Sequence, residues 1–522
     1  MRRAYTSLHQ FAPLDQPATR LAADGIIRVS FMAMNATSAG LWTVAGAALA
    51  LTASAQAPPR DPRAGRGPED PIGKSWAAYD QHCVACHGRN LEGGAAGSLV
   101  DGVWKFGGDD AQIAETIREG RKGTAMASFK PVLTEEQIWR LVVLIRQEEA
   151  EAREHPPTIV DPDGAVIRSE KQAFRIEVVA RDLETPWGLA FLPDGRLLIT
   201  ERPGRLRIVE KGRLLPAAVA NTPTVWNEQD GGLLDVEVHP RYAENGWIYL
   251  SYAKPGPGET SMTAIVRGCV RENRWVNEQE IYSPAPDLYG RPNHHYGSRL
   301  LFDRQGKLLF SIGDRGQKEA AQDLASPLGK VHRVNDDGTV PADNPFAGRA
   351  GAIPTIWTYG HRNPQGLSID PASGLLWESE HGPMGGDEVN ILGAGHNYGW
   401  PVISHGLEPG ITGTAHEGME PPIVYWNPTI APSGIHFYEG TRYEKWRNDL
   451  FVTGLGGTAL RRLEVKGRQV THQEVLFNRY GRVRDVVTGP DGLLYVALQL
   501  PGVKLSSSTP GVIVRLLPVE SP

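Results

Sequence analysis

The chain has 522 residues, with 54 Lys+Arg against 60 Asp+Glu and a formal charge of −6. This length exceeds one ordinary core and indicates two or three domains. With 40% hydrophobic and 22% charged residues the chain is not of the disordered class, and its acidic balance offers no basic surface for nucleic acid. Its 59 Gly and 40 Pro favour many short strands joined by turns.

The N-terminal region carries an apolar run over 40–53 that ends in an A-x-A pattern at Ala55. The run is too short and too rich in small residues for a membrane-spanning helix, and the pattern is typical of signal-peptide cleavage. We interpret residues 1–55 as a signal peptide with an over-extended start, and 56–69 as a linker. These features predict a periplasmic protein with no integral membrane segment in the mature chain. The alternative is a buried helix of the mature fold.

Residues 70–150 have the pattern of a small helical domain. Asp109 is the predicted N-cap of one helix, whose apolar residues recur four apart. Thr134 and Gln137 form a predicted capping box at the start of the next. The segment 151–172 turns charged and then Pro-rich, and we interpret it as a linker between domains.

The chain has three cysteines, and two of them form a C-x-x-C-H motif with Cys83, Cys86 and His87. This spacing is typical of covalent haem c attachment, with two thiols for the vinyl groups and His87 for the iron. Zinc would need further ligands at matched spacing, which the chain does not offer; a redox dithiol is the other alternative. The isolated Cys269 is expected to be a buried, inert thiol.

The stretch from Trp76 to Arg146 resembles a small class I c-type cytochrome along its full length. In that resemblance Met126, in a loop before the last helix, is the second axial ligand of the haem iron. The alternatives are His82 or His155 as ligand, with Met126 as a core residue.

From residue 173 to 522 the pattern changes to an internal repeat of strand, Gly-containing turn and strand. The six units begin at Trp187, Leu233, Ser298, Gly366, Gly434 and Val483. Such repeated hairpins predict an all-β six-bladed propeller, with the small all-α cytochrome c domain N-terminal to it. A sandwich with large insertions is the alternative. The long gaps between units three, four and five are where a site is expected.

The segments between repeats carry unusual polar residues. They read NHHYGSR from Asn293, GDRG from Gly313, GHRNPQG from Gly360, EHGPMGGDEVN from Glu380, NYGWP from Asn397 and YGRVRD from Tyr480. Together and in this order they resemble the soluble aldose dehydrogenases that use pyrroloquinoline quinone (PQQ), within the glucose/sorbosone dehydrogenase family. The resemblance covers roughly residues 174–518.

The resemblance implies how PQQ, with its three carboxylates and ortho-quinone, is held. Arg482 and Arg484 are two residues apart on a strand and can fork onto carboxylates, so they match the PQQ clamp. Arg362 and Asn363 match the pair that holds the quinone oxygens, where charge accumulates on reduction.

Two Ca²⁺ sites are also implied. The carbonyl groups of Gly382 and Pro383 match the loop that binds a catalytic Ca²⁺, which hard oxygen donors suit. Glu388 and Tyr398 match a second, structural Ca²⁺ site, with Asp387 as a further candidate. The alternative for the acidic pair is a solvated loop.

His295 matches the general base that takes the proton of the anomeric hydroxyl, and Asp314 matches the carboxylate that orients it. His294 is the rival base. In the QDGGL segment before unit two, Asp230 is in the register where the family has Gln, and Gln229 is one residue off. Either can be the one that faces the substrate.

A second departure is that the turn over 451–457, after unit five, has no Lys where some members place one on PQQ. The overall prediction is a periplasmic quinohaemoprotein that oxidises aldoses at C1 and passes electrons to haem c. Its partners are then an aldose and an external acceptor such as a cytochrome or blue-copper protein, and a homodimer is an allowed assembly. Two alternatives stay open: a Ca²⁺-dependent propeller lactonase or hydrolase, and a non-catalytic haem-bearing sugar-binding or sensor protein.

Overall fold

The computed structural model describes residues 70–93, 96–154, 160–406, 408, 410–411, 413–427, 429–456, 458–500 and 510–519. The predicted signal peptide, the first linker and His155 lie outside these residues. Within them, every helix is too short or too polar to cross a lipid bilayer.

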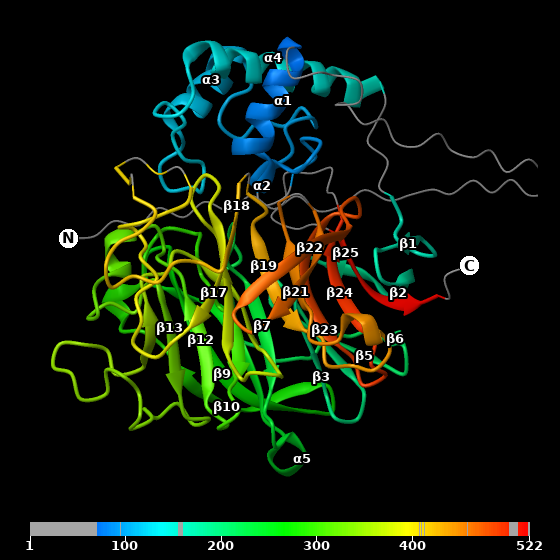
Figure 1. Ribbon diagram of the computed structural model, residues 1–522, viewed down its shortest axis with the longest axis vertical. Coiled ribbons are helices and arrows are strands. Elements are labelled where there is room, and N and C mark those ends of the chain that lie inside the picture. The colour runs from blue at the N-terminus through cyan, green and yellow to red at the C-terminus, as the bar shows by residue number, and fades with distance from the viewer. Residues whose placement is uncertain are drawn as a thin grey trace, which may run out of the picture. The chain divides into compact units, whose positions relative to one another are not determined.

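In the described part of the N-terminal domain there are four helices (Figure 1). They are α1 (Pro71–His82), α2 (Val84–His87), α3 (Asp110–Glu119) and α4 (Glu135–Glu154). Both predicted helix starts are present: Asp109 and Gln112 form a capping box on α3, and the Thr134 and Gln137 side chains bond each other's backbone N–H at α4. These bonds satisfy N–H groups that the helix cannot pair itself.

The apolar faces of the helices share one core. On α3, Ile113 and Ile117 are buried, and on α4 so are Ile138, Leu141 and Val142. Burying each of these side chains stabilises the fold by about 1.5–3 kcal/mol. The apolar residues that recur with the predicted 3.6-residue period therefore form the surface on which the helices pack.

The helix α4 runs to Glu154, a few residues into the segment interpreted as a linker, and β1 begins at Val166 within the same segment. The extra turn is held by an ion pair between Arg153 and Glu149, four residues apart, with a nitrogen–oxygen distance of 2.8 Å. The charged composition that suggested a linker thus stabilises a final helical turn.

Six antiparallel sheets form the C-terminal domain. The first sheet contains β3 (Pro186–Phe191), β4 (Leu197–Glu201), β5 (Arg205–Glu210) and β6 (Arg213–Leu214), and the second contains β7 (Leu233–Val238), β8 (Ile248–Gly256), β9 (Thr260–Arg271) and β10 (Arg274–Tyr282). The third contains β11 (Leu300–Phe302), β12 (Leu308–Ile312), β13 (Lys330–Val334) and β14 (Ile356–Tyr359), and the fourth contains β15 (Pro364–Ile369), β16 (Leu376–Glu380), β17 (Asp387–Leu392) and β18 (Val424–Trp426). The fifth contains β19 (Pro432–Phe437), β20 (Leu450–Gly454), β21 (Leu460–Lys466) and β22 (Gln469–Phe477). The sixth joins β23 (Arg482–Thr488), β24 (Leu494–Gln499), β25 (Pro510–Pro518), β2 (Ala173–Glu184) and β1 (Val166–Arg168). The helix α5 (Tyr242–Asn245) and short 3₁₀ turns at Pro286–Leu288, Lys318–Ala321 and Glu444–Trp446 connect strands.

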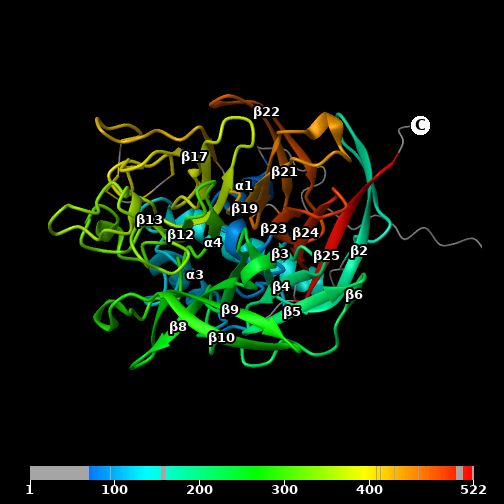
Figure 2. The ribbon, with the colours of Figure 1, turned by 90° about the horizontal axis from the view of Figure 1, so that it is seen from below.

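The sheets are the blades of a six-bladed propeller, as the repeat predicts. Their first strands contact one another in the closed order β3, β7, β11, β15, β19, β23 and back to β3. Figure 2 shows β3, β19 and β23 nearer the centre than β6 and β22. Each predicted repeat unit begins at one of these inner strands or within two residues of it.

The ring is closed by strands from opposite ends of the domain. The early strand β2 pairs antiparallel with β25, from Phe174 opposite Pro518 to Glu184 opposite Pro510. The last blade is therefore built from both chain segments and leaves no open ring edge between blades.

Candidate functional site

The blade topology gathers the predicted site residues at one end of the propeller. In an antiparallel hairpin, the start of the first strand and the end of the second lie at the same end of the sheet. His295 precedes β11 and Asp314 follows β12, while Arg362 precedes β15 and Gly382 follows β16. Equivalent ends of neighbouring blades thus meet, although the residues are far apart in sequence.

His295 and Asp314 form a hydrogen-bonded pair. The distance from Nδ1 of His295 to Oδ1 of Asp314 is 2.7 Å, and Asp314 is 1% exposed. The carboxylate also accepts hydrogen bonds from the Gly316 N–H and from Nε1 of Trp400, each at 2.8 Å. Burial alone would raise the pKa of Asp314, but His295, Arg362 and the Gly316 N–H hold the pKa at about 2. An ionised Asp314 fixes the proton on Nδ1 of His295, so Nε2 is left to accept one.

His294, the rival base, has different surroundings. The His294 ring packs edge to face against the His295 ring, with ring centroids 4.5 Å apart. The Nδ1 atom of His294 is buried without a hydrogen-bond partner. Burial, reinforced by His295, lowers the pKa of His294 to about 3. Of the two imidazoles, His295 is the one that a carboxylate orients.

Arg362 and Asn363 are adjacent in sequence but differ in their contacts. The Asn363 side chain accepts from the Gly297 N–H at 3.1 Å and donates to Nδ1 of His381 at 3.2 Å. It therefore holds the His295 loop and the His381 loop together. Arg362 is half-buried, and its Nη1 donates to the Gly382 carbonyl at 2.7 Å.

The predicted calcium loop is tied down by Asp387. One carboxylate oxygen of Asp387 accepts from the Gly382 N–H at 3.0 Å, and the other accepts from Thr429, Ile430 and Ala431 at 2.6–2.7 Å. The Gly382 carbonyl faces the cationic guanidinium of Arg362, which marks this oxygen as attractive to positive charge. Asp387 is thus fully engaged in holding the loop.

A group of buried arginines has unsatisfied nitrogen atoms. Nε of Arg482, Nε of Arg484 and Nη2 of Arg202 are buried without a partner. Arg484 does bond the Gln365 amide oxygen at 3.0 Å, and Arg482 bonds the Leu455 carbonyl at 3.4 Å. Burial, then the mutual repulsion of these cations, lowers the pKa of Arg484. Such a group is suited to a ligand with several negative charges.

The two arginines predicted as a clamp lie in β23 around a register shift. The pairing of β23 with β24 skips Arg484, between Val483 and Asp485. A bulge of this kind re-aims a side chain relative to regular i, i+2 alternation.

Gln229 and Asp230 lie just before β7. The Gln229 side-chain oxygen is buried without a partner. Burial alone would raise the pKa of Asp230, but Arg202, His294 and His295 favour the ionised carboxylate and lower this pKa. The Asp230 carboxylate interacts electrostatically with Arg202, Arg482 and Arg484, and Gln229 offers a free acceptor.

Tyr398 and Glu388 lie on the fourth blade of the ring. The Tyr398 hydroxyl donates to the Ile391 carbonyl and accepts from the Gly393 N–H, at 2.8 and 2.9 Å. The hydroxyl is thus engaged within the fold, and the backbone carbonyl is the other oxygen that this residue can offer to a cation. Glu388 pairs in register with Glu380, and burial raises its pKa well above the usual range.

In the helical domain, α2 presents the C-x-x-C-H motif. The Nδ1 of His87 lies 3.0 Å from the Gly97 carbonyl, so the imidazole donates there and keeps Nε2 free as a ligand atom. Burial raises the pKa of Cys83 to about 12 and also raises the pKa of Cys86. Neutral thiols of this kind do not favour a redox dithiol.

Met126 is half-buried and packs, like Cys83, against the helical core. Its loop is fixed by two bonds: the Met126 carbonyl accepts from the Arg121 N–H at 2.9 Å, and the Met126 N–H donates to Thr124 Oγ1 at 3.1 Å. His82, one alternative ligand, has a buried Nδ1 without a partner, and burial lowers its pKa.

The sequence did not predict a role for three residues of the site: Arg202, His381 and Trp400. His381 is half-buried with its Nε2 buried and unpartnered, and desolvation, reinforced by Arg362, lowers its pKa to about 3. His381 and Trp400 stand in segments that the sequence already marks as unusual, EHGP and NYGWP. Arg202 follows β4 in an ordinary-looking turn, and only its place at the blade end reveals it.

Comparisons with known proteins agree with this architecture. The profile of a family described as Glucose / Sorbosone dehydrogenase matches residues 183–505. A second profile, described as Cytochrome C oxidase, cbb3-type, subunit III, matches residues 71–145.

The propeller has relatives among characterised and solved proteins. The chain is 40% identical over 331 residues to aldose sugar dehydrogenase YliI of Escherichia coli, covering 62% of this chain and 89% of the relative. It is similar to the solved apo-form of the soluble aldose sugar dehydrogenase from Escherichia coli, at 36% identity and a TM-score of 0.62, covering 66% and 100% of the two chains. The PQQ-bound aldose sugar dehydrogenase from Streptomyces coelicolor is 26% identical with a TM-score of 0.54, covering 68% and 100%.

Proposed function

Because the chain belongs to the glucose/sorbosone dehydrogenase family and carries a cytochrome c domain, we propose that it is a periplasmic, PQQ-dependent aldose dehydrogenase that delivers electrons to its own haem c. The reaction converts an aldose to its lactone, with loss of two electrons and two protons. An external cytochrome or blue-copper protein then takes the electrons away. Periplasmic location is supported by the haem motif, because c-type haem is attached outside the bacterial cytoplasm.

The observation that carries the proposal is the pairing of an oriented base with an unsatisfied cationic group. Ionised Asp314 holds His295 with Nε2 free, and Arg202, Arg482 and Arg484 leave buried nitrogens without partners. A tricarboxylate such as PQQ fits these guanidinium groups, since each can form charge-assisted hydrogen bonds with it. When bound, PQQ supplies a quinone that accepts hydride from C1 of the sugar.

This chain's own residues do the proton chemistry. We assign Nε2 of His295 to take the proton of the anomeric hydroxyl as the C1–H bond breaks. Asp314 stabilises the imidazolium that results, being 2.7 Å from Nδ1. Trp400 and Gly316, bonded to the same carboxylate, hold Asp314 in place. Gln229 and Asp230 are assigned to bind the sugar hydroxyls.

A Ca²⁺ ion fits the loop of Gly382 and Pro383. The Gly382 carbonyl already bonds a cationic group, Arg362, and carbonyl oxygens suit this ion. Ca²⁺ would act as a Lewis acid toward a bound quinone. Its binding at Gly382 would free the guanidinium of Arg362 for the ligand. Glu388 and the Tyr398 carbonyl are assigned to a second, structural Ca²⁺.

The haem assignment rests on α2. The Cys83 and Cys86 thiols are spaced for covalent attachment, and Nε2 of His87 is left free by the bond of Nδ1 to Gly97. Met126 is assigned as the second axial ligand. Haem c supplies a one-electron acceptor with a potential raised by a methionine ligand.

The test is a reductive titration of the full chain with a panel of aldoses, with and without added PQQ and Ca²⁺, recorded at the haem bands. We expect the haem to be reduced by at least one aldose only when PQQ and Ca²⁺ are both present. Haem that stays ferric under every aldose would overturn the proposal. Hydrolysis of a sugar lactone by the PQQ-free chain would replace it with a lactonase, and absence of PQQ uptake in absorbance spectra would indicate a binding protein.

A further inference from the structure

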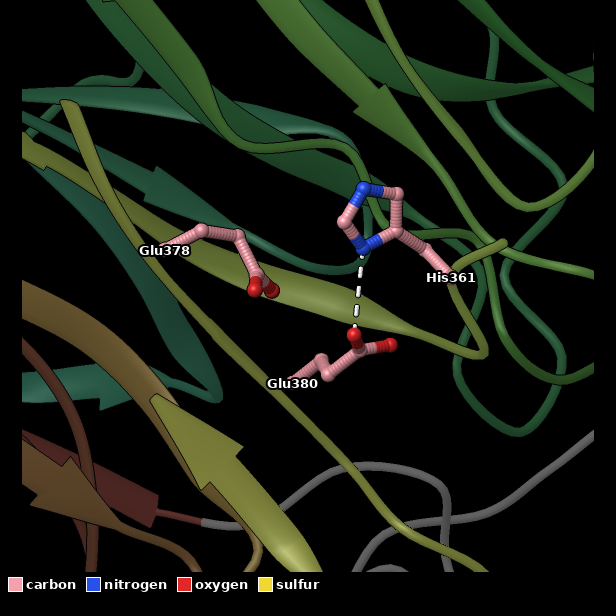
Figure 3. Close-up of side chains that lie close together, drawn as sticks. All are labelled: His361, Glu378 and Glu380. Carbon is pink, nitrogen blue, oxygen red and sulfur yellow. Dashed lines mark hydrogen bonds and ion pairs between the residues drawn. The ribbon is translucent and has the colours of Figure 1, made fainter. Parts of the chain in front are cut away.

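The fourth blade contains a buried cluster outside the predicted cofactor contacts. His361 precedes β15, and Glu378 and Glu380 stand on one face of β16. One ligand atom from each lies within 4.8 Å of the other two, and their exposed fractions are 0%, 0% and 4%. Figure 3 shows the two carboxylates and the imidazole turned toward one another.

The cluster has more negative charge than its neighbours balance. His361 Nδ1 lies 3.1 Å from Glu380, and the Asn390 amide donates to Glu378 at 3.1 Å. Glu388 borders the group, as the register partner of Glu380. Across the described ranges, no Lys or Arg forms an ion pair with Glu378 or Glu380. Buried carboxylates of this kind require a counter-charge or a proton.

One acceptor in the cluster is unused. Oε1 of Glu378 is buried and has no hydrogen-bond partner, although its other oxygen bonds Asn390. The Asn390 side-chain oxygen is also buried without a partner. Since the oxygen and nitrogen of an amide are nearly the same in shape, a rotation of this amide would turn its oxygen toward the carboxylates.

We propose that His361, Glu378 and Glu380 form an internal binding site for a divalent transition-metal ion, with Asn390 as a fourth ligand. One imidazole nitrogen and carboxylate oxygens are ligands that suit Zn²⁺ or Mn²⁺, whereas Ca²⁺ favours all-oxygen sites. Thr358 supports this assignment: its hydroxyl lies 2.9 Å from Nε2 of His361, so Nε2–H can donate to it and leave Nδ1 to the metal.

The ion would brace the loop that presents Arg362. Glu380 would bind it through Oε1, while Oε2 accepts a hydrogen bond from the Arg362 N–H at 2.6 Å. The Tyr398 ring stacks on His361 with centroids 4.8 Å apart and covers the imidazole. The role is structural, and the site shares no residue with either proposed Ca²⁺ site, although Glu388 of the second one borders it.

The competing arrangement is a proton in place of the metal. Burial, followed by the neighbouring Glu380, raises the pKa of Glu378 well above its usual range, so that a protonated Glu378 would also relieve the charge. The two arrangements make opposite predictions for Glu378→Gln. If a metal is bound, the neutral amide removes one of its ligands. If Glu378 is instead protonated, the amide changes the charge of the cluster little.

The experiment uses the full chain, dialysed free of metals and then kept in excess Ca²⁺ so that calcium sites stay filled. Zn²⁺ and, separately, Mn²⁺ are titrated by calorimetry, with metal content measured by mass spectrometry. We expect about one Zn²⁺ or Mn²⁺ per chain that Ca²⁺ does not displace, with affinity reduced about 10–100-fold or more in Glu378→Gln and in His361→Gln. Circular dichroism shows whether each variant is folded. If Glu378→Gln is not folded, His361→Gln takes its place in the test.

Glu201→Gln is the matched control. Glu201 is also a buried carboxylate on the second strand of a blade, but it pairs with Arg205 at 2.7 Å. This variant should keep the metal at unchanged affinity. The proposal is overturned if the parent chain binds no more Zn²⁺ or Mn²⁺ than Glu378→Gln does, or if Glu201→Gln loses the ion to the same extent. Neither result depends on PQQ or on sugar oxidation, so it leaves the proposed function to its own test.

Discussion

The carboxylate of Asp314 and the arginine group of Arg202, Arg482 and Arg484 differ in how their hydrogen bonds are satisfied. Asp314 accepts bonds from His295, Gly316 and Trp400, all within the chain. The arginines are equally buried but keep nitrogen atoms without partners. A satisfied group is held in place before any ligand arrives, whereas unsatisfied buried donors carry a free-energy cost that a complementary ligand removes. The proposed base is therefore preorganised, whereas the arginine group keeps donors that a complementary ligand would satisfy.

The largest expected effect comes from removing the base. His295→Ala should lower kcat for aldose oxidation by about 10²–10⁴-fold, because the proton of the anomeric hydroxyl loses its acceptor. Haem absorbance and circular dichroism should be unchanged. Steady-state kinetics with an artificial acceptor measure this, and His294→Ala is the comparison. If His294→Ala shows the larger loss, the roles of the two histidines are reversed.

The arginine group should show its effect in cofactor affinity. Arg484→Gln should weaken PQQ binding by about 10–100-fold, the loss of one charge-assisted hydrogen bond. Activity measured against added PQQ gives the half-saturating concentration. Arg213→Gln, an exposed arginine of β6, is the control and should leave that concentration unchanged. An equal shift in both variants would mean that charge in general, not this group, sets the affinity.

Asp314 should also reveal itself in the pH dependence of stability. Its pKa of about 2 lies below that of an unfolded Asp, so the ionised form stabilises the folded chain above about pH 4, and this contribution is lost as the pH falls through 2. At pH 7 it amounts to about 2–3 kcal/mol. Asp314→Asn should lower Tm at pH 7, and the difference in Tm between the parent chain and this variant should become smaller from pH 4 to pH 2. A gap that is constant with pH would show that packing, not charge, is lost.

The smallest change concerns the haem and leaves the propeller untouched. Met126→Ala should lower the haem reduction potential and alter the absorbance spectrum, because a methionine ligand raises the potential. Potentiometric titration measures it. Met419→Ala, a half-buried methionine of the propeller, is the matched control. An unchanged spectrum in Met126→Ala would direct attention to His82.

The fold was accessible from the sequence because its signals are local. Strand–turn–strand units repeat, and each predicted start falls at an inner strand or within two residues of one. The capping residues Asp109 and Thr134 mark helix starts through bonds to residues three positions away. Both kinds of signal depend on neighbours in the chain, so one sequence is enough to detect them.

The site was only partly accessible, because it depends on the closed ring. The resemblance supplied His295, Asp314 and the two clamp arginines as candidates, but the bond of Arg362 to the Gly382 carbonyl joins the ends of two strands. The three-way cluster at His361 likewise forms only when β15 lies beside β16. No spacing in the sequence distinguishes Arg202 from a surface arginine, since its burial is a property of the assembled blades.

The pairing of β2 with β25 also sets an order for the assembly of the molecule. The ion pair between Glu177 and Arg515 joins residues 338 positions apart, so the early strand emerges from the ribosome long before its partner exists. The helical domain is complete in sequence before that strand is made. Its core is built from residues of that one segment, so it can fold while the ring is still open. A chain cut short by a dozen or so residues would then keep a complete helical domain attached to a propeller whose ring cannot close.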